Sequence, residues 1–151
     1  MIPHLIVDAS VGIKTRVAEP LSDRAAAIIR SLDRGTTLGV PDLFFVECAN
    51  VLWKYVRRMG YSAQKARADL EQLLNLPLTV TPTADLAVEA LDLALAHDIT
   101  VYDASYVALA IRESATLVTA DEKLARKLAG LGPTVRWLGD ISDAELGPPV
   151  M

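Results

Sequence analysis

The sequence contains very few of the side chains that proteins use as nucleophiles or as ligands of soft metals. Cys48 is the only cysteine, so an internal disulfide is impossible and a zinc site built from several thiolates is excluded. His4 and His97 are the only histidines, and neither lies in a cluster that looks catalytic. Any chemistry is therefore left to carboxylates, whose oxygens favour hard cations such as Mg²⁺.

Long apolar runs and an excess of positive charge are also missing. No run approaches the roughly 18 residues of a membrane span, and the opening segment MIPHLIVDAS lacks the features of a secretory signal peptide. We therefore expect a cytoplasmic protein with no membrane partner. The 15 Lys and Arg against 19 Asp and Glu give a formal net charge of −4. This balance argues against binding nucleic acid by charge alone, although bound cations would reverse the local sign.

Hydrophobic residues make up 52% of the 151 residues, which is enough for one domain with a full core. Short apolar segments alternate with segments of helical periodicity. This order predicts an α/β fold, with a central parallel sheet of about five short strands flanked by helices. The strands are expected within HLIVDAS, TTLGVP, PLTVTP, ATLVTAD and PTVRWLG. A single domain is expected over residues 1–151, with a disordered tail at 147–151.

Helices are expected at residues 21–33, 42–58, 62–76, 83–97, 103–113 and 122–131. Asp42, Ser62 and Thr83 each stand where one of these helices begins and are predicted to cap it. Asp8 and Asp121 each stand at the end of a strand. Because ligands of an open α/β sheet bind at the carboxyl ends of its strands, these two acids mark the expected position of a site.

An isolated acid interrupts the helix expected at residues 42–58. The segment FFVECANVLW carries an apolar stripe at helical spacing that consists of Phe44, Cys48, Val51 and Tyr55. Glu47 adjoins this stripe, and a buried carboxylate is costly unless its charge is compensated. A bound cation would compensate it, and Asn50, three residues on, could orient the carboxylate. The alternative is a buried ion pair with Lys54 or with an arginine elsewhere.

Four acids in all follow or interrupt apolar segments: Asp8, Glu47, Asp103 and Asp121. Carboxylates brought together repel each other at neutral pH. Such a cluster is explained by a bound Mg²⁺ or Mn²⁺, which can polarise a phosphate oxygen and activate a water. The alternative for the three aspartates is that each only caps a helix, a position that aspartate favours. Capping does not explain Glu47, which lies past the first turn of its helix.

The order and spacing of these residues resemble the PIN-domain family of metal-dependent ribonucleases, and most closely the small toxins of VapBC-type toxin–antitoxin pairs. The resemblance covers nearly the whole chain, through LIVDASV, PDLFFVECANVLWKYVRR, TVYDASYVALA, TLVTADEKLARK and VRWL. It implies a PIN-like fold in which the four acids are catalytic and bind the metal, Asp121 being the more variable one. The small hydroxyl residues near the family's site correspond to Ser10 and Thr119.

The resemblance also implies a function. One or two Mg²⁺ or Mn²⁺ ions would hold the scissile phosphate and activate a water for in-line attack, leaving a 5′-phosphate and a 3′-hydroxyl. The expected partners are an RNA substrate, a cognate antitoxin protein and a second copy of the chain in a homodimer. Two alternatives keep the fold and change the role: an RNA-processing nuclease outside a toxin–antitoxin pair, or a non-catalytic interaction module.

Basic residues occur in two clusters beside the expected site. They are Lys54, Arg57 and Arg58 in KYVRR, and Lys123 and Arg126 in DEKLARK. These residues could position the RNA backbone, because phosphate contacts orient nucleic acid without reading its sequence. The alternative is that both clusters are solvated and only complement a helix dipole. Trp53 and Tyr55 could stack on bases, but we expect at least one of them to pack in the core.

Two other α/β folds that place a metal site at strand ends fit less well. A receiver-type phosphoacceptor domain has paired acids after its first strand and a lysine after its last. Here Asp8 has no acidic neighbour, and VRWLGD contains no lysine. A haloacid-dehalogenase-like phosphatase has an acid two residues after its first aspartate, where this chain has Ser10.

Overall fold

The computed structural model describes residues 4–146, and the disorder expected at residues 147–151 falls outside them. Within the described residues, five strands form one sheet in the order β3-β2-β1-β4-β5, and every neighbouring pair is parallel. The strands are β1 His4–Val7, β2 Thr37–Pro41, β3 Thr79–Thr81, β4 Thr116–Thr119 and β5 Val135–Trp137. Each lies within a segment for which a strand is predicted, so the predicted α/β fold is confirmed.

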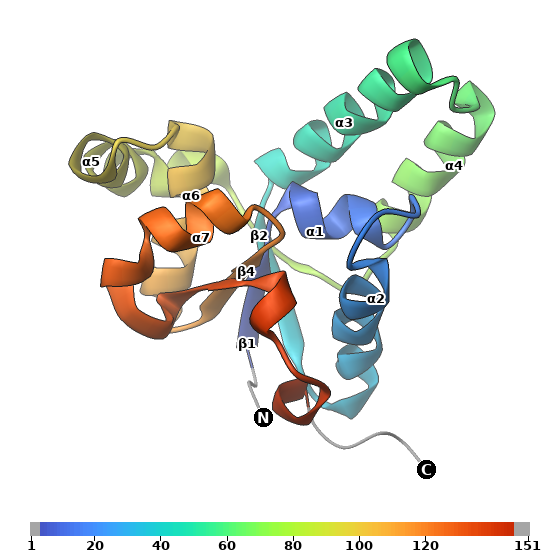
Figure 1. Cartoon of the computed structure of the whole chain (residues 1–151). Coiled ribbons are helices and arrows are strands. Elements are labelled where there is room, and N and C mark those ends of the chain that lie inside the picture. The colour runs from blue at the N-terminus through green and yellow to red at the C-terminus, as the bar shows by residue number, and fades with distance from the viewer. Residues whose placement is uncertain (1–3, 147–151) are drawn as a thin grey trace.

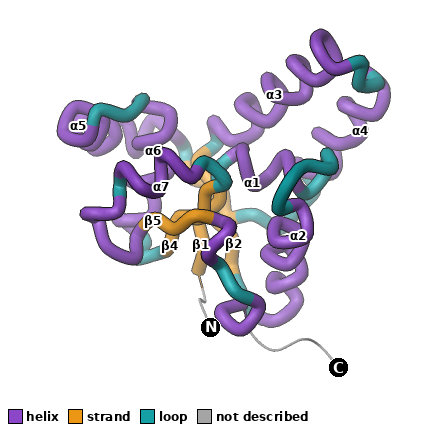
Figure 2. The backbone as a smooth tube through the Cα atoms, viewed as in Figure 1, coloured by secondary structure: helices purple, strands orange, loops and turns teal. Residues whose placement is uncertain are grey.

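Seven α-helices surround this sheet within residues 4–146 (Figures 1 and 2). They are α1 Ala9–Lys14, α2 Ser22–Ser31, α3 Leu43–Met59, α4 Ala63–Leu74, α5 Ala87–His97, α6 Val101–Arg112 and α7 Glu122–Lys127. Helices α1 and α2 lie on one side of the sheet and α6 lies on the other, with α5 packed against α6. Helices α3 and α4 extend away from the sheet as a pair that we call the arm (Figure 1). None of the helices in this range combines the length and the apolar character that crossing a membrane requires.

The inner strands are buried on both faces, as parallel strands covered by helices must be. Leu5 and Ile6 of β1, Leu38 of β2 and Leu117 of β4 are all 0% exposed. Helix α6 is buried along its middle, from residue 104 to residue 110. Its small Ala104 packs with Ala90 and Ala94 of α5, and the helix also contacts β1 and β2, so α6 is held between α5 and the sheet.

The direction of the strand order changes at β1. The chain proceeds from β1 through β2 to β3 on one side, and β4 and β5 follow on the other side. The loops after β1 and β4 therefore diverge, and such a switch point leaves a crevice at the carboxyl ends of the strands. Helix α1 begins directly after Asp8, and α7 begins directly after Asp121. Both acids stand at the crevice, as the sequence predicts.

Close packing of α1 against α3 supplies a further wall of this crevice. A Cβ atom at Gly12 of α1 would lie 2.6 Å from the ring of Phe44 on α3, which is closer than real side chains approach. The glycine therefore allows the two helices to approach each other. Glu47 lies one turn after Phe44, so this contact also brings Glu47 toward Asp8. Helix α1 has only six residues and is not among the predicted helices.

The arm has the ends that its sequence predicts. Gly60 follows α3 with φ of +67°, a conformation that glycine adopts without the penalty of a Cβ atom. Ser62 caps α4, and its hydroxyl accepts a hydrogen bond from the Lys65 backbone N–H at 3.1 Å. The rings of Tyr55 and Tyr61 then meet edge to face across the turn, with their centroids 5.9 Å apart.

Two predicted caps are wrong in an instructive way. The Asp42 side chain does not cap α3. It accepts hydrogen bonds from the backbone N–H of Thr83, at 2.8 Å, and from the Thr83 hydroxyl. Thr83 does not cap α5 either, since it begins the 3₁₀ turn Thr83–Leu86, and its hydroxyl accepts from the Leu43 N–H at 3.1 Å. Asp42 therefore bonds to the start of the 3₁₀ turn that precedes α5, and Thr83 bonds to the start of α3. These bonds join two helix starts that are far apart in sequence.

Two other predicted helix boundaries also need correction. Thr100, rather than Asp103, caps α6, and its hydroxyl accepts from the Asp103 N–H at 3.1 Å. Asp103 is therefore the third residue of its helix, and capping does not explain it. The helix predicted at residues 122–131 ends at Lys127, and a 3₁₀ segment, Ala129–Thr134, leads into β5.

Candidate active site

A cleft of about 550 Å³ lies at the carboxyl ends of β1 and β4. The four predicted acids line it, each from a different element or loop, and so do eight further residues: Ala9, Ser10, Val46, Asn50, Val51, Lys54, Tyr102 and Tyr106. The fold therefore brings together side chains that lie more than 110 positions apart in the chain, from Asp8 to Asp121.

Asp8 is buried, with 7% exposure, at the start of α1. Its carboxylate accepts a hydrogen bond from the Ser10 hydroxyl at 2.5 Å and one from the Val11 N–H at 3.3 Å, so it does cap the helix. Burial is the main cause that raises the pKa of Asp8 to about 6, and the charge of Asp103 contributes, although the bonds from Ser10, Thr119 and Val11 oppose the shift. Capping and site membership are thus compatible at this position.

Ser10 and Thr119 connect the loops after β1 and β4. The Ser10 hydroxyl accepts from the Ala120 N–H at 2.9 Å and lies 3.5 Å from the Thr119 hydroxyl. The Thr119 hydroxyl in turn accepts from the Asp121 N–H at 3.1 Å. Because Ser10 also donates to Asp8, this chain of bonds fixes Asp8 and the backbone of Asp121 relative to each other. Asp121 itself is exposed and caps α7 through the Leu124 N–H at 3.1 Å.

Glu47 is held by a tyrosine, which the sequence analysis did not single out. The Tyr106 hydroxyl donates a hydrogen bond to Glu47 Oε1 at 2.6 Å, and the Tyr106 side chain is only 1% exposed. Among the described residues, Glu47 forms no ion pair with Lys54 or with any arginine, so the predicted alternative is not seen. Tyr106 lies one turn after Asp103 in α6, and that spacing is the signal that could have identified it.

The acids of the cleft act on one another electrostatically. Burial is the main cause that raises the pKa of Glu47, and the charges of Asp103 and Asp8 add to it, while the Tyr106 bond lowers it. Burial also raises the pKa of Asp103, with a contribution from the charge of Asp121 and an opposing bond from Thr100. These carboxylates therefore lie close enough to repel each other.

The donor set fits a hard divalent cation, because four carboxylates around one cleft supply only oxygen ligands. As the side chains stand, however, no three His, Cys, Asp or Glu side chains within residues 4–146 converge closely enough to hold an ion. Binding would draw the carboxylates inward from their present positions. The arrangement can concentrate positive ions, and with them a phosphate, at the switch point of the sheet.

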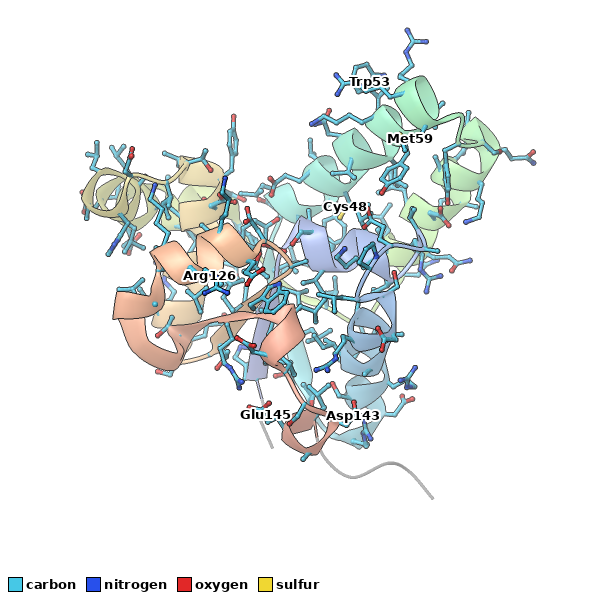
Figure 3. All side chains as sticks on the ribbon, in the orientation of Figure 1. Cys48, Trp53, Met59, Arg126, Asp143 and Glu145 are labelled. Atoms are coloured by element: carbon cyan, nitrogen blue, oxygen red, sulfur yellow. The ribbon has the colours of Figure 1, made fainter. Side chains whose placement is uncertain are left out.

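Of the five predicted basic residues, the structure brings only Lys54 into the lining of the cleft. Arg57 and Arg58 are exposed in the last turn of α3, toward the outer end of the arm. Trp53 on α3 is 53% exposed, whereas the partly buried Tyr55 packs against the core. Figure 3 shows Trp53 and Met59 on the arm and Cys48 at its base.

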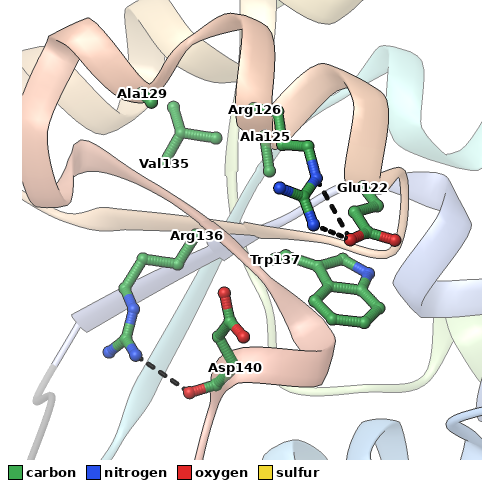
Figure 4. Close-up of a pocket in the computed structure, with 8 residues that line it drawn as sticks. All are labelled: Glu122, Ala125, Arg126, Ala129, Val135, Arg136, Trp137 and Asp140. Atoms are coloured by element: carbon green, nitrogen blue, oxygen red, sulfur yellow. Dashed lines mark hydrogen bonds and ion pairs between the residues drawn. The ribbon is translucent and has the colours of Figure 1, made fainter.

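Lys123 and Arg126 lie beyond Asp121 on the exposed face of α7. Arg126 is paired with Glu122 in a separate hollow of about 480 Å³ that also contains Arg136 and Trp137 (Figure 4). Arg126 does not line the cleft with the acids. The basic residues predicted after Asp121 are thus near the site in sequence, but the structure directs at least one of them elsewhere.

The chain matches the family model described as PIN domain over residues 5–129. This range runs from β1 past the end of α7 and includes all four acids. The protein belongs to the PIN-domain family, and the predicted resemblance is confirmed.

Individual relatives agree with this assignment. Ribonuclease VapC3 of Pyrobaculum aerophilum is 39% identical over 129 residues, which cover 84% of this chain and 96% of that protein. Ribonuclease VapC12 of Mycobacterium tuberculosis is 31% identical over 122 residues, covering 81% of this chain and 90% of that protein.

Two solved structures share the fold. The crystal structure of PAE2754 from Pyrobaculum aerophilum has a TM-score of 0.68 at 24% identity, covering 95% of this chain and 88% of that chain. A toxin–antitoxin complex from Klebsiella pneumoniae has a TM-score of 0.59 at 16% identity, covering 91% and 99%.

Proposed function

We propose that this protein is a Mg²⁺- or Mn²⁺-dependent ribonuclease that hydrolyses RNA phosphodiester bonds, and that it is the toxin of a cytoplasmic toxin–antitoxin pair. The observation that carries the proposal is the cleft of four acids, in which the described residues supply no ion pair to Glu47 and burial raises the pKa of three carboxylates. The names of the relatives, both ribonucleases, support the choice of reaction.

Asp8, Glu47 and Asp103 would hold the ion, with Asp121 as the fourth ligand. When bound, a divalent ion lowers the pKa of a water and polarises a phosphate oxygen. The residues around it position the ligands. Ser10 donates to Asp8, and Tyr106 donates to Glu47. Asn50, which lines the cleft one turn after Glu47, would contact the same carboxylate once an ion draws it inward.

The proposed antitoxin partner follows from the same charges. The fold is shared with a toxin–antitoxin complex from Klebsiella pneumoniae. An antitoxin that carries an Arg or Lys could reach Glu47 or Asp103 and replace the cation by a direct charge-assisted pair. A structure of the complex in which the antitoxin leaves all four acids uncovered would count against this.

A homodimer is the second proposed assembly. Helix α5 exposes Val88, Leu91 and Leu95 on its outer face, at 74%, 50% and 76%. On α4, by contrast, Leu73 is fully buried and Leu74 is 54% exposed. Apolar side chains at helical spacing favour an interface, and two-fold dimers are the commonest oligomer. We expect light scattering at micromolar concentration to give the mass of a dimer, with the α5 leucines in the contact. A monomeric mass would rule the dimer out.

The direct test of the activity is incubation of the purified protein with mixed cellular RNA, with EDTA and with Mn²⁺, followed by mapping of the cut ends. We expect cleavage only with Mn²⁺, and 5′-phosphate and 3′-hydroxyl ends. Glu47→Gln and Asp103→Asn should lose this cleavage, whereas Glu71→Gln, which removes an exposed acid on the arm, should retain it. Intact RNA with wild-type protein and Mn²⁺ would favour the non-catalytic module, and growth inhibition on expression would separate a toxin from a processing nuclease.

A further inference from the structure

A second, smaller hollow of about 250 Å³ adjoins the acidic cleft. It is lined by Ala9, Ser10, Ile13, Lys14, Glu19, Val51 and Ala120. Ala9, Ser10 and Val51 also line the cleft, so the two spaces share a wall. The side chain of Lys14, which is not among the residues predicted for the site, is only 13% exposed.

The position of Lys14 follows from the geometry of α1. Ser10 and Lys14 are four residues apart in this helix, so they share one face. Ser10 donates to Asp8, at the acidic end of the groove between α1 and α3. Lys14 therefore lies one turn farther along the same groove. Val51 of α3 contributes to both spaces from the opposite wall.

Lys14 retains hydrogen-bonding capacity in this hollow. Its Nζ lies 3.5 Å from Glu19 Oε1, and within residues 4–146 this is the one acceptor that the structure gives it. An ammonium group has three N–H donors, so two remain. Glu19 is also engaged elsewhere, because its other oxygen accepts the hydroxyl of Tyr55. The ammonium group is thus held at the groove by a partner that does not use it fully.

The substrate of the proposed function needs such a group. The cleft is lined by four acids and one lysine, Lys54. Bound ions would compensate the charge of the scissile phosphate. The neighbouring phosphates of the RNA are also negative, and the acids that line the cleft would repel them. A cation beyond the end of the acid cluster removes part of this repulsion, and a buried charge binds a phosphate more strongly than an exposed one does.

We propose that the hollow around Lys14 binds the phosphate group next to the scissile one, with Lys14 Nζ donating to its oxygens. This inference rests on the proposed ribonuclease function and adds a substrate subsite to it. Lys14 is a binding residue in this account and takes no part in bond cleavage. Its effect therefore falls on KM rather than on kcat.

The arm provides a matched control. Lys65 Nζ lies 3.2 Å from Asp69 Oδ1, and Asp69 also accepts the hydroxyl of Tyr61. This lysine, carboxylate and tyrosine repeat the chemistry of Lys14, Glu19 and Tyr55, but they lie on the arm and line neither the cleft nor the hollow. Lys65 is 55% exposed and Lys14 13%. If both lysines only brace helices, then loss of either should leave KM for RNA unchanged.

The experiment compares Lys14→Met, Lys14→Gln, Lys14→Arg and Lys65→Met in Mn²⁺ on one RNA oligonucleotide that the wild-type protein cleaves. We expect Lys14→Met and Lys14→Gln to raise KM about tenfold, the loss typical of a hydrogen bond to a charged group, with kcat within about twofold of wild type. Lys14→Arg should recover most of the affinity, and Lys65→Met should behave as wild type. The Lys14→Gln variant keeps a polar side chain that is one atom shorter, so it gives the result even if Lys14→Met folds poorly.

A substrate change identifies the phosphate. Replacing one phosphate beside the scissile bond by a neutral methylphosphonate, on the 5′ side or the 3′ side, should raise KM of the wild-type protein about tenfold in one of the two positions. For Lys14→Met, the same methylphosphonate should raise KM little beyond the value for the unmodified RNA, because this variant has already lost the interaction with the phosphate. Additive effects at both positions, or equal effects of Lys14→Met and Lys65→Met, overturn the subsite while leaving the ribonuclease proposal intact. Absence of RNA cleavage by the wild-type protein overturns both.

Discussion

The pKa values of carboxylates shift in opposite directions in two regions of this molecule. In the cleft after β1 and β4, burial and mutual repulsion raise the pKa of Asp8, Glu47 and Asp103. In the C-terminal segment, Glu145 pairs with Arg136 and accepts hydrogen bonds from Ser142, and its pKa falls to about 2. Figure 3 shows Glu145 at the end of the molecule opposite the arm.

The direction of the pKa shift distinguishes carboxylates that form a binding site from carboxylates that stabilise the fold. A carboxylate that stabilises the fold is given a partner by the fold, as Glu145 is. Within residues 4–146, the acids of the cleft receive only hydroxyl and backbone donors, so the fold holds their charges near one another at a cost in stability. A cost of this kind is explained if a cation from outside the chain offsets it.

The largest effect on stability is expected at Asp8. A pKa raised from 3.8 to about 6 means that the folded protein holds a proton that the unfolded chain releases, so metal-free stability falls as pH rises from about 4 to about 6. Two pKa units correspond to about 3 kcal/mol. Asp8→Asn removes this cost and keeps a side chain that can cap α1. In EDTA at pH 7.5 the variant should therefore be more stable than wild type by up to about 3 kcal/mol.

Urea denaturation of both proteins at several pH values checks this. The stability difference should shrink as the pH falls from about 6 toward about 4, because the folded chain then binds the proton on Asp8 and the unfolded chain begins to bind it as well. A difference that stays constant between pH 4 and pH 7.5, or a variant that is less stable throughout, would contradict the account of Asp8.

The next effect is expected at Tyr106, whose hydroxyl is the donor that the structure gives to Glu47. Tyr106→Phe removes one oxygen and keeps the buried ring. Loss of a residue that orients a metal ligand costs roughly 10–100-fold in metal affinity or activity. Titration of RNA cleavage with Mn²⁺ should show this loss as a higher metal concentration at half-maximal rate. An unchanged metal titration would mean that the bond only supports the fold.

The smallest effect is expected in the contrasting region. Glu145→Gln removes a pair whose side chains are 27% and 32% exposed, so water screens it and the loss at pH 7 should be no more than about 1 kcal/mol. Because the folded pKa is lowered, this contribution is present above pH 4.5 and is lost as pH falls through about 2. Thermal melts at pH 7 and pH 2 measure both values. A gain in stability at pH 7 would place Glu145 with the acids of the cleft and remove the contrast.

The architecture was largely predictable because it depends on local patterns. Apolar strands such as LIV in β1 and TLVT in β4 alternate with helices. When helices connect successive strands, the strands pair in parallel and the helices cover both faces of the sheet. The predictions failed where a partner is distant in sequence. Asp42 and Thr83 look like caps, and each does bond to the start of a helix, but they exchange helices across 41 positions. A local pattern carries no information about that exchange.

The same limit applies to the site. Its four acids were predicted from their places after strands and within an apolar helix, and the structure gathers them around one cleft. Tyr106 was missed because a tyrosine in an apolar helix is usually only a part of the core, and Lys14, our proposed phosphate contact, was missed because a lysine at a helix end is ordinary. Their roles depend on which groups the fold places opposite them. Arg126 illustrates the converse, since it is close to Asp121 in sequence but pairs with Glu122 in another hollow.

The sharpest test of the metal site is thermal or chemical unfolding of wild type, Glu47→Gln and Asp103→Asn, each with EDTA and with Mn²⁺. If the cleft is a metal site, both variants should be as stable as wild type or more stable in EDTA. Wild type should gain about 2.7 kcal/mol at a hundredfold excess of Mn²⁺ over its dissociation constant, and the variants should gain much less. Glu71→Gln on the arm serves as the control and should respond to Mn²⁺ as wild type does. The contrary result is clear destabilisation of both cleft variants in EDTA, by ~1–5 kcal/mol as for a lost cap or buried pair, together with an undiminished response to Mn²⁺.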